Sequence, residues 1–369
     1  MTAEVWFAPG RANLMGEHTD YNEGFVLPFA LAQGVTATAS ARDDGQLVLR
    51  SRQAPGETAV PLGSLAPGSV TGWAAYPAGV AWALRAAGHR VRGASVDVDS
   101  NLPVGAGVSS SAALECSVAL ALCSLSGIAV PRRELAAIAR RAENEFVGAP
   151  TGIIDQSAAL LCQQDHALLL DCGTLRTVQV PFVPAAAGVS ALVIDTRVPH
   201  ALVSGEYAAR RAECEEAARL LGVPALGTVT DLSKLDQLTD PVLRRRARHV
   251  ITDSARAQAI AAALLGAEPG DRETYRFIGQ ELLAGHASLR DDFEVSWPAA
   301  DTAVEAAVAA GAYGAKMIGG GFGGSVLALV PERHLGTLRI SVAQMFAARG
   351  WTAPEFIDAA ASPPARRLC

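Results

Sequence analysis

Residues 102–115 read LPVGAGVSSSAALE and carry the clearest structural signal in the chain. Gly105 and Gly107 permit backbone conformations that other residues rarely adopt, and three serines follow them directly. The apolar run that comes next predicts a helix over 112–126, ended by Gly127. Free N–H groups and the helix dipole attract an anion to such a helix start, so the segment predicts a phosphate-binding loop. An ordinary serine-rich helix cap is the alternative.

A second glycine-rich segment, GAKMIGGGFGG, occupies residues 314–324. Its glycines satisfy the pattern GxGxxG, but a strand pattern follows at 325–330, where a dinucleotide site requires a helix. We interpret the segment as a loop whose backbone approaches a ligand or another loop closely. Neither Lys234 nor Lys316 completes a GxxxxGK[ST] motif, which excludes a Walker-type phosphate site.

A third segment, residues 10–28, reads GRANLMGEHTDYNEGFVLP and crowds polar side chains between glycines. Arg11, Glu17, His18 and Asp20 all lie in it. Several donors and acceptors on one short loop suit a polyhydroxylated ligand, because each sugar hydroxyl needs a partner in a fixed position. Carboxylates make the stronger, charge-assisted hydrogen bonds. A solvated charged loop is the alternative interpretation.

Composition limits the possible classes of protein. Of 369 residues, 50% are hydrophobic and 18% charged, which provides a large core and argues against disorder. A net charge of −6 is unfavourable for binding nucleic acid. The six cysteines form no CxxC pair, so we expect reduced thiols. The first residues lack an apolar signal-peptide core, and prolines interrupt the uncharged run 177–194. We expect a monomeric cytoplasmic protein with neither nucleic acid nor membrane as a partner.

Strand and helix patterns alternate along the chain, which predicts an α/β or α+β protein of two lobes with a boundary near 160–175. Short strand patterns lie at 35–40, 47–49, 96–98, 168–170 and 192–194. Helix patterns lie at 73–87, 132–146, 152–161, 205–221, 241–265, 273–290 and 299–311.

The three glycine-bearing segments together resemble the three motifs of galactokinases, within the galactokinase–homoserine kinase–mevalonate kinase–phosphomevalonate kinase (GHMP) superfamily. Residues 10–28 resemble the galactokinase signature, whereas 102–115 and 314–324 resemble motifs shared across the superfamily. AENEFVG and TGIIDQ within 142–156, and the segment 204–222, match as well, so the resemblance spans nearly the whole chain.

This resemblance implies the two-lobed α+β GHMP-kinase fold. Residues 1–165 would form an N-terminal ribosomal-protein-S5-like domain and residues 166–369 a C-terminal ferredoxin-like domain, with the active site between them. The implied reaction is ATP-dependent, magnesium-requiring phosphorylation of the anomeric hydroxyl of α-D-galactose. A kinase for a related sugar, such as N-acetylgalactosamine or arabinose, is an alternative. A non-catalytic sugar and ATP sensor is another, which the presence of Asp155 and Arg11 disfavours.

The resemblance also implies roles in the sugar site. Asp155 matches the catalytic base and Arg11 the arginine beside it. A guanidinium next to a carboxylate favours its charged form, and the carboxylate can then accept the proton of the attacking hydroxyl. The implied sugar contacts are Glu17, His18, Asp20, Gly152 and Tyr207.

In the nucleotide site, the resemblance implies that one loop wraps the phosphates, through Gly105, Ala106, Gly107, Val108, Ser109, Ser110 and Ser111. Ser111 and Glu143 match ligands of Mg²⁺, and both offer the oxygen atoms that this hard cation prefers. Trp73 and Tyr76 match a pair that packs on adenine. Residues 75–78 (AYPA) depart from the family pattern there, and core packing is the alternative for Trp73.

Overall fold

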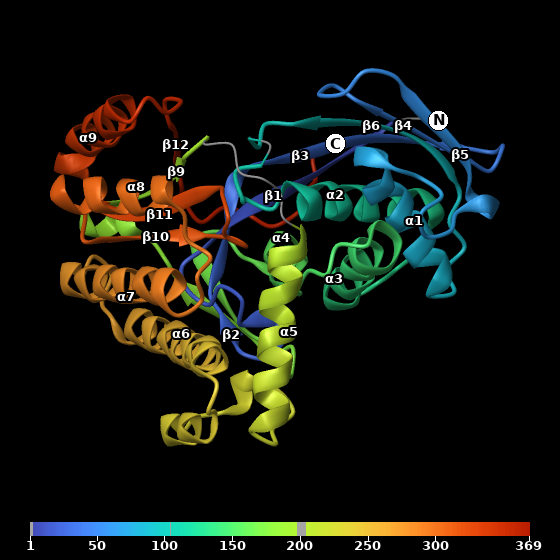
Figure 1. The fold of residues 1–369 in the computed structure, drawn as a ribbon. Coiled ribbons are helices and arrows are strands. Elements are labelled where there is room, and N and C mark those ends of the chain that lie inside the picture. Colours follow the sequence, from blue (N-terminus) through green and yellow to red (C-terminus); the bar gives the residue numbers. More distant parts are fainter. Residues whose placement is uncertain (1–2, 104, 198–203) are drawn as a thin grey trace.

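The computed structural model describes residues 3–103, 105–197 and 204–369, and its strands form three sheets (Figure 1). The strands are β1 (Glu4–Asn13), β2 (Phe25–Val26), β3 (Pro28–Arg42), β4 (Gln46–Ser51), β5 (Glu57–Pro61), β6 (Gly93–Ser100), β7 (His166–Asp171), β8 (Thr177–Pro181), β9 (Val189–Asp195), β10 (Gly314–Ile318), β11 (Ser325–Pro331), β12 (Glu355–Asp358) and β13 (Arg366–Arg367). The α-helices are α1 (Ala75–Ala86), α2 (Ser110–Ser126), α3 (Arg132–Arg141), α4 (Ile154–Leu161), α5 (Ser204–Leu220), α6 (Pro241–Gly266), α7 (Arg272–Asp291), α8 (Pro298–Ala309) and α9 (Leu335–Ala348).

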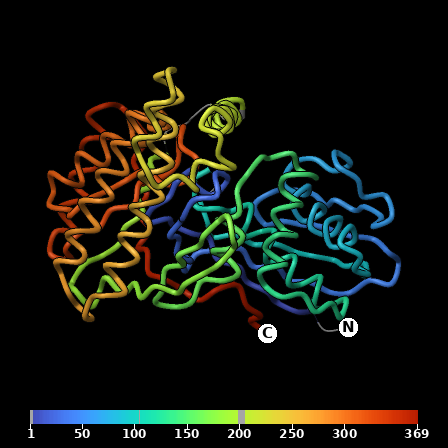
Figure 2. The backbone as a smooth tube through the Cα atoms, turned by 90° about the horizontal axis from the view of Figure 1, so that it is seen from below, coloured from blue at the N-terminus to red at the C-terminus, as the bar shows by residue number. Residues whose placement is uncertain are grey.

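The sheets divide the molecule into two lobes (Figures 1 and 2). The N-terminal lobe contains a six-stranded sheet of order β13-β1-β3-β6-β4-β5, in which only the β4–β6 pair is parallel, with α1 to α4 on one side. The C-terminal lobe contains the antiparallel sheet β10-β11-β9-β12, and α7 and α8 pack against β10. A small sheet, β2-β7-β8, pairs a strand that lies between β1 and β3 in sequence with two strands that lie between β6 and β9, and so pairs residues of both predicted domains.

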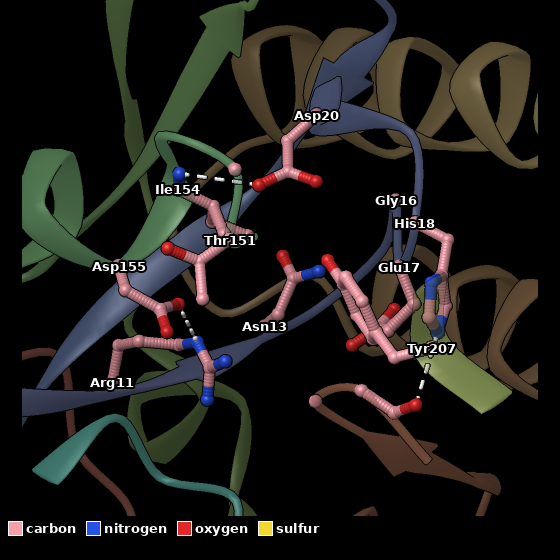
Figure 3. Close-up of a pocket in the computed structure, with 13 residues that line it drawn as sticks. Arg11, Asn13, Gly16, Glu17, His18, Asp20, Thr151, Ile154, Asp155 and Tyr207 are labelled. Atoms are coloured by element: carbon pink, nitrogen blue, oxygen red, sulfur yellow. Dashed lines mark hydrogen bonds and ion pairs between the residues drawn. The ribbon is translucent and has the colours of Figure 1, made fainter. Parts of the chain in front are cut away.

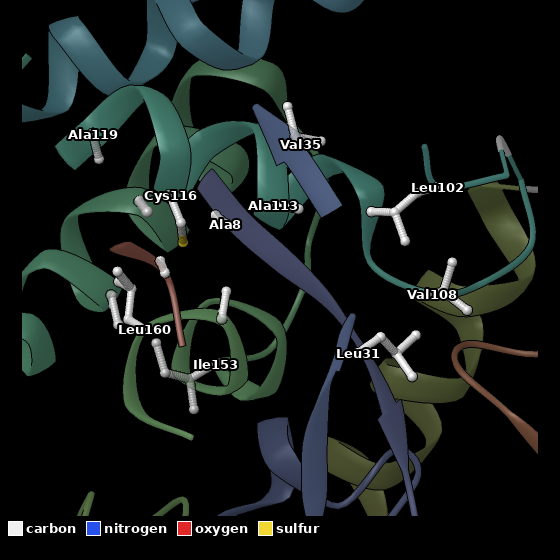
Figure 4. Packing of buried hydrophobic residues seen from close by; sticks show 14 of the residues in the cluster. Ala8, Leu31, Val35, Leu102, Val108, Ala113, Cys116, Ala119, Ile153 and Leu160 are labelled. Atoms are coloured by element: carbon white, nitrogen blue, oxygen red, sulfur yellow. The ribbon is translucent and has the colours of Figure 1, made fainter. Parts of the chain in front are cut away.

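The core of the N-terminal lobe holds the predicted phosphate loop through buried side chains before it and within it. Small side chains on α2, among them Ala113 and Cys116, are fully buried and pack toward β1 and β3 (Figure 4). Leu102, just before the loop, and Val108, within it, are also buried in this cluster. Burial of these two side chains holds the loop in place, because well-packed side chains resist displacement.

Helix α2 begins at Ser110, two residues before the predicted start at 112, and Gly127 ends it in the left-handed conformation as expected. The helix predicted over 132–146 differs more. Regular α-helix ends at Arg141 and a wider π-helical turn, Ala142–Val147, follows. This turn buries Glu143, and π-helical turns are frequent at functional sites.

Two segments join what a boundary at residue 165 would separate. Phe25 and Val26 of β2 pair with Asp171 and Leu170 of β7, and β13 near the end of the chain pairs with β1. The domain limits 1–165 and 166–369 stay a prediction. Within the described parts of the chain, no helix combines the length and apolar character needed to cross a bilayer.

Candidate active site

A cavity of about 180 Å³ opens between the end of β1, the loop 14–24, the start of α4, α5 and the glycine loop after β10 (Figure 3). It brings together all seven residues predicted for catalysis and sugar binding, which are Arg11, Glu17, His18, Asp20, Gly152, Asp155 and Tyr207. Asn13, Gly16, Thr151, Ile154, Gly319 and Gly320 complete its lining.

An ion pair joins the predicted base to the first strand. The Nε atom of Arg11 lies 2.9 Å from Oδ1 of Asp155, with the arginine buried and the carboxylate one-fifth exposed. The guanidinium also donates to the carbonyl of Gly107, and the backbone N–H of Arg11 donates to the carbonyl of Val108 at 3.1 Å. Arg11 therefore connects the candidate base directly to the predicted phosphate loop.

Asp20 lies at the opposite wall and depends on Gly152. Its Oδ1 accepts from the N–H of Tyr21 at 3.0 Å and its Oδ2 from that of Ile154 at 3.4 Å. A Cβ at position 152 would lie only 1.7 Å from Oδ2 of Asp20, so this approach requires glycine. Burial, followed by the charge of Asp155, raises the pKa of Asp20 above its ordinary value.

His18 forms a rigid part of the wall. Its Nδ1 lies 2.9 Å from the hydroxyl of Tyr21 and its Nε2 3.2 Å from the carbonyl of Gly320. Burial, followed by the charge of His249, lowers the pKa of His18 to about 3, so the ring is neutral at pH 7. Because a carbonyl can only accept, the network assigns the proton to Nε2, and Nδ1 accepts from Tyr21. Tyr207 packs against the ring at a centroid distance of 5.2 Å.

Glu17 forms a buried ion pair with Lys316 of β10. Burial is the largest effect on the pKa of Glu17 and raises it, whereas the charge of Lys316 acts in the opposite direction. The second carboxylate oxygen, Oε1, is buried without a hydrogen-bond partner among the described residues. One oxygen is thus held by the lysine while the other is free for a ligand. The sequence pattern around Lys316 excluded a Walker-type motif but gave no indication that Lys316 pairs with Glu17.

Helix α6 holds the backbone of the loop 14–24 within the motif at 10–28, the sugar-signature loop, and of the residue that follows it. His249 Nε2 lies 3.0 Å from the carbonyl of Glu17, Asp253 accepts from the N–H of Gly16 at 3.0 Å, and Ser254 accepts from the N–H of Phe25 at 2.9 Å. Sequence reasoning predicted this helix but missed these contacts. The sequence pattern that could have indicated these contacts is three polar residues at helical spacing, i, i+4 and i+5, on the buried face of the helix.

The predicted phosphate loop leads into α2 with left-handed backbone at Gly107 and Ser109. The hydroxyl of Ser109 is buried and has no hydrogen-bond partner among the described residues. A bound anion would supply that partner. The glycine loop after β10 packs on this loop, since a Cβ at Gly319 would lie 3.0 Å from the carbonyl of Gly107. Close approach to another loop is what the sequence predicted for residues 314–324.

The two predicted magnesium ligands lie together. The hydroxyl of Ser111 donates to Oε1 of Glu143 at 2.9 Å, and the other oxygen of Glu143 accepts from Gln156 at 2.7 Å and Thr151 at 3.0 Å. Burial, with the charge of Asp155 next, raises the pKa of Glu143. The pair offers the oxygen atoms that Mg²⁺ prefers, so the residues fit the ion.

Trp73 and Tyr76 lie at the start of α1 in different surroundings. Trp73 belongs to the short 3-10 turn Gly72–Ala74 and packs, partly buried, against the core. Tyr76 is half-buried, and burial followed by the charges of Glu143 and Glu115 raises its pKa. Helix α1 packs on the π-helical turn that carries Glu143. Adenine packing by Trp73 and Tyr76 stays a prediction.

Known proteins resemble the chain along nearly its full length. Family models described as "Galactokinase galactose-binding signature", "GHMP kinases N terminal domain" and "GHMP kinases C terminal" match residues 2–41, 75–163 and 275–345. The chain is 49% identical to the galactokinase of Streptomyces coelicolor over 369 residues, covering 99% of this chain and 94% of that protein. It is 44% identical to the galactokinase of Mycobacterium bovis over 364 residues, covering 98% of both.

Solved structures agree with the sequences. The crystal structure of Lactococcus lactis galactokinase complexed with galactose superimposes with a TM-score of 0.93 at 32% identity, covering 99% of this chain and 95% of that one. A mevalonate kinase structure shares the fold, with a TM-score of 0.67 at 14% identity, and covers 100% and 99% of the two chains. With the Arg11–Asp155 pair, the sugar-signature loop and the phosphate loop in one place, these similarities show that the chain belongs to the galactokinase family of GHMP kinases.

Proposed function

We propose that Asp155 is the base and Arg11 its charge partner in the transfer of the γ-phosphoryl group of ATP to the anomeric hydroxyl of α-D-galactose. Membership of the galactokinase family gives the overall reaction, ATP-dependent phosphorylation of galactose. The observation that supports the residue assignment is the 2.9 Å Arg11–Asp155 pair, which lies where the sugar cavity meets the phosphate loop.

In this reaction the anomeric oxygen forms a bond to the γ-phosphorus while the bond from that phosphorus to the bridging oxygen of ADP breaks. Asp155 receives the proton of the hydroxyl. Arg11 offsets negative charge on the transferred phosphoryl group. If the transition state is loose, the proton moves late and most of the rate enhancement comes from positioning the two substrates.

The remaining walls orient the substrates. Glu17 and Asp20 accept hydrogen bonds from sugar hydroxyls, while His18, Tyr207 and the backbone at Gly152 enclose the ring. Backbone N–H groups of residues 105–111 hold the phosphates at the start of α2. Trp73 and Tyr76 pack on the adenine.

Ser111 and Glu143 would hold Mg²⁺ together with the nucleotide. When bound, the ion neutralises charge on the phosphates. In the chain itself, Gln156 and Thr151 fix the carboxylate of Glu143 toward the loop.

We also propose that the protein acts as a monomer in the cytoplasm. All six cysteines are free thiols, as suits a reducing compartment. Sedimentation velocity tests the first statement, and fractionation of cells tests the second.

The assignment of the base is tested by the Asp155→Ala variant. We expect its turnover of galactose and ATP to fall by roughly 100- to 10,000-fold, the usual contribution of a general base. Nucleotide affinity, measured by calorimetry without sugar, should stay within about threefold because Arg11, and not Asp155, contacts the phosphate loop. The exposed Asp236→Ala variant is the control. Near-normal turnover of Asp155→Ala would contradict the assignment.

A further inference from the structure

Asn13 is the last residue of β1 and lines the sugar cavity, but it is not among the proposed catalytic or sugar-binding residues. Its exposed fraction is 1%, and neither Nδ2 nor Oδ1 has a hydrogen-bond partner among the described residues. Buried amide groups are almost always paired, and leaving one unpaired is costly. An unpaired buried carboxamide at the wall of a ligand cavity therefore indicates a group that the ligand completes.

The strand explains why this side chain points inward. Side chains alternate between the two faces of a strand, so Arg11 and Asn13 share the face of β1 that turns toward the cavity. Arg11 reaches Asp155 from this face. The amide of Asn13 points into the space that the labelled side chains surround (Figure 3).

The cavity is rich in acceptors, and its other donors are largely occupied. Glu17, Asp20 and Asp155 present carboxylates, which accept hydrogen bonds. Both ring nitrogens of His18 already have partners, and the guanidinium of Arg11 is engaged by the Asp155 carboxylate and the Gly107 carbonyl. A pyranose has one oxygen without a proton, the ring oxygen, and lone pairs on every hydroxyl. These atoms need donors, and the amide of Asn13 supplies two N–H groups.

We propose that Asn13 binds the sugar directly, donating from its amide to an oxygen next to the reacting carbon, either the ring oxygen or the hydroxyl oxygen on carbon 2. The inference rests on the proposed function, because Asp155 must face the anomeric hydroxyl. A strand advances about 3.3 Å per residue, so Asn13 lies about 7 Å along β1 from Arg11 and meets the atoms adjoining that hydroxyl. The contact selects the sugar orientation that presents the anomeric oxygen to the base.

The test compares Asn13→Ala and Asn13→Ser with the wild-type enzyme on three substrates: galactose, 2-deoxygalactose and a carbocyclic galactose in which a methylene replaces the ring oxygen. We expect kcat/KM for galactose to fall by about 10- to 100-fold, the usual effect of removing a buried hydrogen-bond partner. Nucleotide affinity without sugar should stay within about twofold. For the analogue that lacks the oxygen bound by Asn13, the substitution should lower kcat/KM by less than about threefold.

Gln179→Ala is the matched control, because Gln179 also carries a partly buried amide with an unpaired oxygen but lies on β8, outside the cavity. It should leave all three kcat/KM values unchanged. The proposal is overturned if Asn13→Ala and Asn13→Ser lower kcat/KM for galactose by less than threefold. It is also overturned if the two variants lower kcat/KM by the same factor for all three sugars. The amide would then act through the fold or through a trapped water. Failure of the wild-type enzyme to phosphorylate galactose refutes the proposed function, and calorimetric binding of galactose to the variants still tests Asn13.

Discussion

Gly152 and Asp20 illustrate how closely single residues define the sugar cavity. A methyl group at position 152 would overlap the carboxylate of Asp20, with only 1.7 Å between Cβ and Oδ2. We expect Gly152→Ala to displace Asp20 and to raise the KM for galactose by about 10- to 100-fold, as small misplacements near a reacting group do. Steady-state kinetics with galactose varied measure the effect.

Gly336→Ala is the matched control for this variant. A Cβ at position 336, in α9, meets nothing within 4 Å. That protein should show the wild-type KM. A wild-type KM for Gly152→Ala as well would mean that Asp20 does not contact the sugar.

Glu115 predicts a dependence of stability on pH. It is fully buried and accepts from Gln156 at 3.0 Å, and burial, with the charge of Glu143 next, raises the pKa of Glu115 well above its ordinary value. The folded state keeps a proton that the unfolded state releases above about pH 4.3, so this group lowers stability as pH rises. We expect Glu115→Gln to raise the free energy of unfolding at pH 7 and to lose that advantage near pH 4.

Urea unfolding at a series of pH values measures this difference. The exposed Glu268→Gln variant is the control and should follow the wild-type curve. An advantage of Glu115→Gln that does not change between pH 4 and pH 7 would show that Glu115 is not the titrating group.

At the scale of elements, α6 positions the sugar-signature loop from the other lobe. Asp253 accepts the N–H of Gly16, and a hydrogen bond to a charged group contributes roughly 1.5–3 kcal/mol. We expect Asp253→Ala to raise the KM for galactose by about 10-fold or more, because the loop carries Glu17 and Asp20. Nucleotide affinity should change little, since the phosphate loop lies on α2.

The exposed Gln258→Ala variant, on the same helix, is the control and should behave as wild type. Separate titrations of galactose and nucleotide distinguish the outcomes. Equal losses of affinity for both substrates would indicate general destabilisation and not a positioning role of Asp253.

The elements were largely predictable where local signals were strong. Helix α7 was expected over 273–290 and spans Arg272–Asp291, and α2 was expected over 112–126 and spans Ser110–Ser126. Helix α9 was missed, since only Leu338, Val342 and Phe346 form its buried face. The π-helical turn was missed because its spacing depends on where Glu143 and Phe146 become buried, which local propensity does not encode.

At the scale of the whole molecule, the sequence indicated the fold and the residues of the cavity through motifs that lie within continuous segments. It could not indicate the groups that hold those motifs in place. Asp253 and Gly16 are 237 positions apart, and Lys316 and Glu17 are 299 apart. Such contacts exist only after the two lobes pack together. The sequence showed Asn13 only as part of a motif, and its role became visible once β1 placed its unpaired amide in the cavity beside Arg11.

Arg11 contacts Asp155 on one side and the carbonyl of Gly107 on the other, so one guanidinium touches both substrate pockets. A displacement of the phosphate loop would therefore act on Asp155 through this guanidinium, and a displacement of Asp155 would act on the loop. Thermodynamic reciprocity then requires that any factor by which galactose alters the affinity for ATP be returned, unchanged, by ATP acting on galactose. Dissociation constants for this enzyme are therefore best measured for each substrate both with and without the other, and the two ratios must agree.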